Sequence, residues 1–211
     1  MLHFTSEDLD AMHHLYRINL INSCSGYKSA NLVGTKSSDG ISNVAIFSSV
    51  THIGSNPALL GFFLRPTTVV RNTYVNIKET GVFTLNHIHK TILEDAHHTS
   101  AKYDASLSEF DMTDLKEEYK NAFPAPFVKQ SPIQMAMTFV EEYNIKSNNT
   151  ILLIGKIKDL YVYNNLLQND GFLNLSEAQI VAINGLDGYS IPKLKTRLKY
   201  QRPKGFSEIK T

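Results

Sequence analysis

The sequence predicts a protein that is mainly β with helical insertions and folds as a single antiparallel barrel domain. Three observations favour this fold class: predicted strands outnumber helices, most neighbouring strands are close enough along the chain to pair antiparallel, and the helices fall between strands. The chain has 211 residues, of which 42% are hydrophobic and 19% charged. This length supports one good core, so we expect one domain over residues 1–211 with its core at about 20–202.

The barrel is expected to begin with a hairpin. A strand over residues 30–36 is followed by Ser38-Asp39-Gly40, where Asp-Gly supplies the positive φ that a tight turn needs. The return strand should cover residues 42–50. After a turn at residues 54–57, the apolar run Ala58–Leu64 is short enough to be a strand buried on both faces.

A helix is predicted after this apolar strand. Pro66 ends the strand, and Thr67 or Thr68 can serve as the helix N-cap because a hydroxyl accepts hydrogen bonds from free backbone N–H groups. The helix should run to about Thr80 and end at Gly81, since glycine readily adopts the left-handed conformation that follows a helix.

The second half of the chain continues the β pattern. Residues 82–88 form the next predicted strand, and residues 91–119 are helical and irregular. Two long strands over residues 133–145 and 151–162 are separated by a polar turn. In residues 193–200 charged residues alternate with leucine, threonine and tyrosine, which favours a late edge strand whose charges discourage aggregation.

Composition limits the partners and the compartment. The formal net charge of +1 gives no reason to expect nucleic acid or a membrane surface as a partner. No apolar run reaches the length of a membrane span. Cys24 is the only cysteine, so no intramolecular disulfide can form, and the acidic, polar N-terminus does not fit a signal peptide. We therefore expect a soluble, cytoplasmic protein.

The predicted helix start has the composition of an anion site. Free N–H groups and the positive end of the helix dipole attract phosphate there. Thr67 and Thr68 add hydroxyls, and Arg71 adds a fork of charged donors. Asn72 and Thr73 supply further donors in the same stretch. Taken alone, these residues are more simply explained by a capped helix with a solvated arginine.

The stretch 43–77 resembles the flavin reductase-like family, whose members fold as an FMN-binding split β-barrel. The resemblance continues more loosely from about Gly34 to Arg202. Its matching segments are Asn43-Val44-Ala45, Phe47-Ser48-Ser49, Asn56-Pro57, Arg65-Pro66 and Arg71-Asn72-Thr73-Tyr74-Val75-Asn76-Ile77. The resemblance implies the split-barrel fold and an FMN phosphate held between Arg71 and Thr73. Asn72 stands where an acidic residue is common in the family, and an uncharged amide is compatible with an anion.

The resemblance also implies where the flavin ring would lie. Small residues at Ala45, Ser48 and Ser49 let backbone N–H groups approach the pyrimidine edge of the ring. Side chains alternate along a strand, so one flavin cannot meet both Asn43 and Val44 through side chains, and some contacts must be main-chain. The alternative is an ordinary strand end whose serines bond local backbone groups. The full set of expected cofactor contacts is Asn43, Val44, Ala45, Ser48, Ser49, His52, Arg65, Thr67, Thr68, Arg71, Asn72 and Thr73.

The histidines raise the question of a metal. His87 and His89 share a strand face, and a predicted helix with Glu94, His97 and His98 follows. Three such ligands could converge on zinc or iron. We favour surface histidines without a metal, since no compact ligand motif such as HExxH is present.

Residues on the substrate side form a separate group. His52 falls just past Ser48-Ser49 and is expected to line the flavin pocket, while Ser100, Tyr103 and residues 108–110 lie where the family has a loop over the ring. The sequence contains no G-x-G-x-x-G after a strand, no P-loop, no G-x-S-x-G and no cysteine with a partner base. We therefore expect no catalytic side chain and a cofactor that carries the chemistry.

The resemblance implies a homodimer with each flavin near the interface. The expected activity is hydride transfer from NAD(P)H to N5 of FMN, followed by transfer of electrons to free flavin, oxygen or a partner, with a small molecule as the acceptor. Two alternatives remain open. One is a flavin-dependent reductase of another acceptor, such as a redox protein or an organic compound. The other is a non-enzymatic split-barrel protein that binds flavin or haem.

Overall fold

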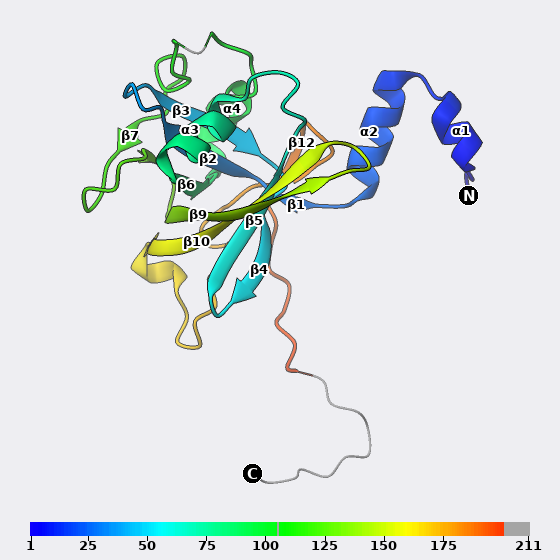
Figure 1. Ribbon diagram of the computed structural model, residues 1–211. Helices are drawn as coiled ribbons and strands as arrows, with labels where there is room; N and C mark the ends of the chain where they lie inside the picture. The colour runs from blue at the N-terminus through cyan, green and yellow to red at the C-terminus, as the bar shows by residue number, and fades with distance from the viewer. Residues whose placement is uncertain (105, 201–211) are drawn as a thin grey trace.

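The computed structural model describes residues 1–104 and 106–200 and is built on one seven-stranded sheet (Figure 1). The strand order is β3-β2-β6-β9-β10-β5-β4, and every neighbouring pair is antiparallel. The strands are β2 (Asn31–Lys36), β3 (Ser42–Phe47), β4 (Thr51–Ser55), β5 (Ala58–Leu64), β6 (Val82–His87), β9 (Ile133–Ile145) and β10 (Thr150–Val162).

The sheet curls around an apolar core. Its two edge strands, β3 and β4, follow one another in the chain and are joined by residues 48–50. Inside, Phe62 meets Phe47 and Phe83 edge to face, with ring centroids 4.8 and 5.6 Å apart. Burying each such side chain contributes about 1.5–3 kcal/mol to stability. The same core contains Val33, Leu64, Leu85, Met137 and Leu153.

Helix α3 (Asn72–Thr80) connects β5 to β6 and packs against β2. It buries Ile77 in the barrel core, together with the polar side chains of Thr73 and Asn76. Gly81 ends the helix with φ +72°, a conformation that costs glycine little because it has no Cβ. One face of α3 is therefore held firmly on the sheet, which fixes where the helix starts.

A second helical segment covers the outer face of β2 and β3. It consists of η1 (Lys90–Ile92) and α4 (Leu93–His98), and its Ile92 and Ala96 belong to a cluster with Leu32 and Val44. A further short helix, η2 (Asn164–Leu166), follows β10. The remaining strands form two small sheets, which are β1 (Lys28–Ser29) with β11 (Ala182–Asn184) and β12 (Gly188–Ser190), and β7 (Glu117–Glu118) with β8 (Phe127–Val128).

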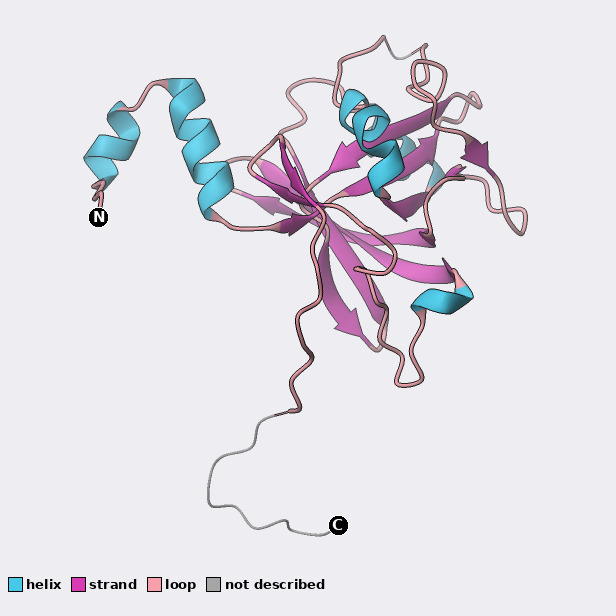
Figure 2. Ribbon diagram, turned by 180° about the vertical axis from the view of Figure 1, so that it is seen from behind, coloured by secondary structure: helices cyan, strands magenta, loops and turns pink. Residues whose placement is uncertain are grey.

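An N-terminal arm of two helices extends away from the barrel (Figures 1 and 2). α1 (Ser6–Ala11) begins with a capping box between Thr5 and Asp8. α2 (His14–Cys24) follows, and neither helix contains a buried residue. Sequence analysis did not predict this arm.

Most predicted elements are confirmed, and several are wrong. The predicted return strand 42–50 stops at Phe47, because residues 48–50 bend and the chain then forms β4 against β5. β5 is not buried on both faces, since Phe63 points out of the barrel and is 41% exposed. Residues 193–200 form no strand; Arg197 instead bonds Asp170 at 2.6 Å.

The predicted helix start is also wrong. α3 begins at Asn72 with Arg71 as its N-cap, whereas Thr67 and Thr68 lie in a turn before it. Two β-branched valines, at positions 69 and 70, separate that turn from the helix. β-Branched side chains lose rotamer freedom in a helix, which disfavours helical structure there.

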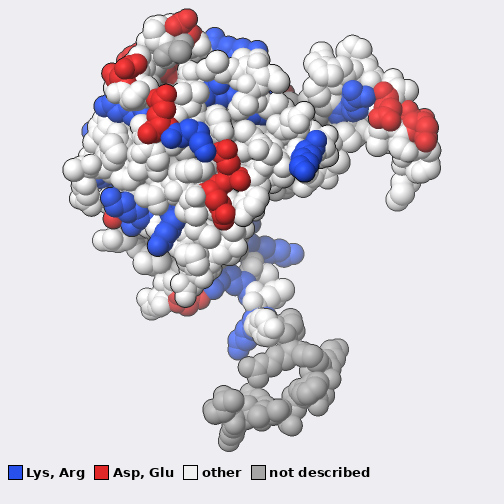
Figure 3. All heavy atoms as spheres, in the orientation of Figure 1, with Lys and Arg blue, Asp and Glu red and all other residues white. Residues whose placement is uncertain are grey.

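The surface shows no large field of one sign on the face in Figure 3, where acidic and basic side chains are interspersed. This agrees with the formal net charge of +1. Among the residues that the structure describes, no helix combines the length and the apolar composition needed to cross a bilayer.

Candidate functional site

Most of the residues expected to bind the cofactor lie in one region of the fold. It is bounded by the end of β3, the end of β5, segment 65–71 and the first turn of α3. Two sets of hydrogen bonds hold these pieces together. Asn43 of β3 donates to Thr73 of α3 over 3.2 Å, and the Ser49 hydroxyl bonds the backbone of Phe63 on β5.

The first turn of α3 leaves backbone donors free. The N–H of Val75 is bonded to the carbonyl of Arg71 at 3.0 Å, as in any first helical turn. Within the described residues, the N–H groups of Asn72, Thr73 and Tyr74 have no acceptor, and no side chain caps the helix. Free N–H groups at the positive end of a helix dipole form an anion site.

A buried guanidinium nitrogen belongs to the same place. Nε of Arg71 is buried and has no hydrogen-bond partner in the described part of the chain. A buried donor without a partner costs roughly 1–3 kcal/mol, and more when it is charged. Arg71 directly precedes the free N–H groups of α3, so one anion at the helix start would satisfy both sets of donors.

The segment before the helix carries further donors. Arg65, Thr67 and Thr68 are exposed, and their side chains have no hydrogen-bond partner among the described residues. Two exposed valines, Val69 and Val70, separate these threonines from Arg71. The hydroxyls predicted as helix caps are therefore available to a ligand rather than used by the helix.

A buried polar network ties the start of α3 to the sheet. The side-chain amide of Asn43 donates to Thr73 Oγ1 at 3.2 Å and to Thr35 Oγ1 at 3.3 Å. The amide of Asn76 donates to the same Thr35 oxygen at 3.0 Å. All four residues are at most 5% exposed. Buried polar groups that bond one another in this way fix a local geometry.

The side chain of Ser49 takes the place of a backbone pairing between strands. β4 and β5 pair Thr51 with Gly61. If this antiparallel register continued two residues further, Ser49 would pair with Phe63. There the Ser49 hydroxyl accepts from the Phe63 N–H at 3.0 Å and donates to its carbonyl at 3.1 Å. The backbone N–H and carbonyl of Ser49 have no backbone partner in the described residues. They are therefore available to a ligand.

The main chain of β3 is used nearby. The N–H of Val44 donates to the buried carboxylate of Glu109 at 3.1 Å. Burial raises the pKa of Glu109, while hydrogen bonds from its own N–H and that of Val44 act in the opposite direction. This contact fixes the loop around residues 108–110 against β3. Val44 is accordingly placed beside the site, with its N–H already occupied.

Three other predicted residues remain. Ala45 and Ser48 are half-buried, and Ser48 has no side-chain partner among the described residues. His52 is exposed on β4, and its Nε2 lies 3.1 Å from the hydroxyl of Ser55. The structure does not bring His52 to the helix start, and its place beside a flavin stays a prediction.

The histidines do not assemble. His97 bonds the hydroxyl of Tyr189 at 2.8 Å, and His98 bonds that of Tyr103. His87 is largely enclosed, and burial lowers its pKa to about 4, so its ring is neutral at physiological pH. No group of three or more His, Cys, Asp or Glu side chains among the described residues could hold a metal ion.

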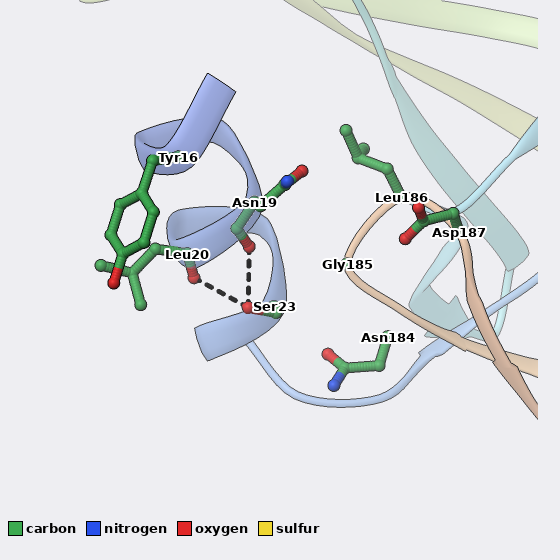
Figure 4. A pocket seen from close by; sticks show the side chains of 8 residues that line it. All are labelled: Tyr16, Asn19, Leu20, Ser23, Asn184, Gly185, Leu186 and Asp187. Atoms are coloured by element: carbon green, nitrogen blue, oxygen red, sulfur yellow. Dashed lines mark hydrogen bonds between the residues drawn. The ribbon is translucent and has the colours of Figure 1, made fainter. Parts of the chain in front are cut away.

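One cavity lies away from this region. It has a volume of about 420 Å³ and opens between α2 and the turn at residues 184–187, as Figure 4 shows. A second cavity of about 260 Å³ is lined mainly by apolar side chains and by His87 and Ser29. The hydroxyl of Ser29 bonds the carbonyl of Val50 at 3.0 Å, so this cavity adjoins the segment that follows Ser49.

Thr35 and Asn76 are parts of the site that the sequence did not predict. A threonine in a strand and an asparagine on a helix face carry no local signal, because their pairing depends on how α3 crosses β2. Glu109 belonged to a run singled out only for its place in the sequence. Its bond to Val44 joins residues 65 positions apart and follows from no local pattern.

Comparison with known proteins identifies the family. The family model described as flavin reductase like domain matches residues 27–178. Among solved structures, a protein of Shewanella frigidimarina NCIMB 400, described as a candidate flavin reductase with a split barrel domain, is 44% identical with a TM-score of 0.92. That match covers 95% of this chain and 100% of the other.

Two more distant structures share the fold. Nitrilotriacetate monooxygenase component B from Bacillus cereus is 18% identical with a TM-score of 0.81, over 94% of this chain and 98% of its own. The 2-nitrobenzoate 2-nitroreductase of Pseudomonas fluorescens is 18% identical with a TM-score of 0.78, over 99% and 100% of the two chains. These likenesses, together with the closer one, confirm the predicted split β-barrel.

Proposed function

We propose a function from one premise: the chain belongs to the flavin reductase-like family. It is accordingly a flavin-binding oxidoreductase. We further infer that the flavin is FMN, that NAD(P)H reduces it, and that electrons then pass to free flavin, oxygen or another small-molecule or protein acceptor. In such a protein the flavin supplies the hydride acceptor, and the chain binds and orients it.

The observation that carries this proposal is the unsatisfied start of α3. Three backbone N–H groups and the buried Nε of Arg71 lack acceptors among the described residues. A phosphate monoester offers several anionic oxygens and can accept from all of them at once. Riboflavin has no phosphate, so these donors favour FMN over riboflavin.

The segment after β3 would hold the ring. The free backbone groups of Ser49 and the half-buried Ala45 and Ser48 lie at the edge of the sheet, where a flat ligand can approach the main chain. The Ser49 hydroxyl fixes this segment to β5 without using the backbone groups. These residues hold the ring by hydrogen bonds. No side chain of the protein transfers a proton in this proposal.

We also propose that the protein is a homodimer whose second copy completes each site. Leu15, Tyr16 and Ile21 of α2 are 62%, 57% and 46% exposed. Val69 and Val70, beside the site, are 54% and 74% exposed. Apolar surface of this kind marks an interface, and twofold symmetry is the commonest closed arrangement. Sedimentation that finds a monomer still holding FMN would rule out a shared site.

A second candidate is a flavin-dependent reductase of an organic acceptor. The second cavity, of about 260 Å³, favours it, because apolar side chains line most of this space and it adjoins Val50. We also propose a reducing compartment, the cytoplasm, because Cys24 is the only cysteine.

The visible spectrum of the purified protein, repeated after extensive dialysis, tests the proposal. We expect an oxidised flavin spectrum after FMN is added, and bleaching of that spectrum by NADH or NADPH under anaerobic conditions. Turnover with free flavin would select the reductase, and turnover only with an organic compound would select the second candidate. A flavin spectrum that neither nucleotide bleaches would indicate a carrier, and a Soret band would indicate haem.

A further inference from the structure

The amide of Asn43 is directed at other side chains and not at the edge of the sheet. We propose that Asn43 and Thr35 are positioning residues, which orient the hydroxyl of Thr73 so that its hydrogen faces the phosphate of FMN. This inference rests on the proposed function and assigns to Asn43 a role different from the ring contact that its place in the sequence implies.

The donors of Asn43 are both used inside the protein. A side-chain amide nitrogen has two hydrogens, and those of Asn43 are directed to Thr73 at 3.2 Å and to Thr35 at 3.3 Å. Asn43 is 5% exposed. It therefore has no amide hydrogen left with which to bond a carbonyl oxygen of the flavin ring.

Thr35 holds the amide of Asn43 in place. Thr35 is fully buried on β2, and its oxygen accepts from Asn43 and from Asn76, which fills both of its lone pairs. Because Asn76 is on α3 and Thr35 is on β2, the bond between them also holds the helix against the sheet. The position of the Asn43 amide is thus set by two elements at once.

This network sets the direction of the Thr73 hydroxyl hydrogen. Its hydroxyl oxygen accepts from Asn43, so its own hydrogen does not point toward that amide. Among the described residues the hydroxyl has no acceptor, and its backbone N–H has none either. Thr73 thus presents two donors at the helix start, and Asn43 fixes the direction of one of them.

A double-mutant cycle tests whether Asn43 acts through Thr73. The quantity to measure is the ratio of the riboflavin and FMN dissociation constants, obtained by fluorescence titration, since it isolates the phosphate contribution. We expect about a tenfold fall in this ratio for Thr73→Val and about a 3–10-fold fall for Asn43→Ala, as for the loss of a hydrogen bond. The double variant should match Thr73→Val alone, because the two residues act as one unit.

Two matched substitutions at Thr35 provide an independent test if the Asn43 variant folds poorly. Thr35→Val removes the oxygen and keeps the shape, while Thr35→Ser keeps the oxygen and removes a methyl group. We expect the ratio to fall about 3–10-fold for valine and to stay within about twofold for serine. A purely structural role would weaken both flavins equally and leave the ratio unchanged in every variant.

The outcomes separate this inference from the proposed function. An unmodified protein that binds neither flavin overturns both. An unmodified protein that prefers FMN keeps the proposed function, and additive effects of Asn43→Ala and Thr73→Val would then overturn the positioning role. A fall in riboflavin affinity for Asn43→Ala, with the ratio unchanged, would restore Asn43 as a ring contact.

Discussion

The two ends of the candidate site make their polar groups available in opposite ways. At the start of α3 the side chain of Arg71 and the backbone N–H groups are both free, and the buried network behind them fixes the helix. At Ser49 the side chain is used against β5, which leaves the backbone free. The first arrangement suits a charged group, and the second suits the edge of a flat ring.

This difference predicts which substitutions distinguish FMN from riboflavin. Changes at the helix start should act on the phosphate and therefore on FMN alone. Changes at Ser49 should act on the ring and therefore on both flavins.

Arg71→Ala should have the largest effect. We expect FMN binding to weaken by about 1.5–3 kcal/mol, the range for losing hydrogen bonds to a charged group, with riboflavin binding unchanged. Isothermal titration with both flavins measures the difference. Arg197→Ala is the matched control, because the Arg197 guanidinium pairs with Asp170 and belongs to neither end of the site. Equal FMN affinity in Arg71→Ala and the unmodified protein would remove the helix start as the phosphate site.

Ser49→Ala should have a smaller effect that is shared by both flavins. It removes two hydrogen bonds to Phe63, each worth about 0.5–1.5 kcal/mol of stability, and loosens the segment that would hold the ring. We expect a lower thermal midpoint and weaker binding of FMN and riboflavin by the same factor. Ser147, which is exposed in the turn between β9 and β10, provides the control variant Ser147→Ala. Selective loss of FMN binding in Ser49→Ala would contradict the division of the site into two ends.

Glu109 sets a pH dependence beside the ring end. Burial raises its pKa in the folded protein, so the folded state favours the protonated carboxyl. Its contribution to stability is therefore fully present below the unfolded pKa and is lost as the pH rises through the folded pKa. Glu109→Gln keeps an acceptor for Val44 and removes the buried charge. Denaturant unfolding should find the variant at least as stable as the unmodified protein at neutral pH, with the difference shrinking in acid. A variant that is less stable at neutral pH and equally stable in acid would contradict this.

His52→Ala should have the smallest effect. No cluster of possible metal ligands converges on the site among the described residues, and His52 is exposed. Flavin reduction by NAD(P)H should slow by less than the factor of about 10²–10⁴ that marks a true general acid or base. Stopped-flow measurement across pH decides this. A larger loss, with a pH dependence near the histidine range that disappears in the variant, would make His52 catalytic.

Local signals in the sequence predicted most of the barrel. Asp39-Gly40 fixes the first hairpin, and the long apolar stretches of β9 and β10 follow directly from their alternation and length. The start of α3 was misplaced because two threonines look like caps, while the valines that follow them disfavour a helix. The arm of α1 and α2 contains no buried residue, so its sequence has no apolar stripe from which the helices could be predicted.

The sequence predicted several residues of the candidate site, but it did not predict which of their side chains contact one another. Arg71 and Thr73 were found because they lie near a predicted helix start, which is a local property. The bond between Asn43 and Thr73 joins residues 30 positions apart, and it exists only because α3 crosses β2 and β3 at one particular place. Thr35 takes part for the same reason. Such pairings depend on the packing of the whole barrel, which a single sequence does not display.

A crystal structure of the protein with FMN tests the central claim most directly. We expect a phosphate within hydrogen-bond distance of the N–H groups of Asn72 and Thr73 and of the Arg71 guanidinium, with the ring along Ser48 and Ser49. A flavin bound in the cavity between α2 and residues 184–187, with the start of α3 still unsatisfied, would contradict it.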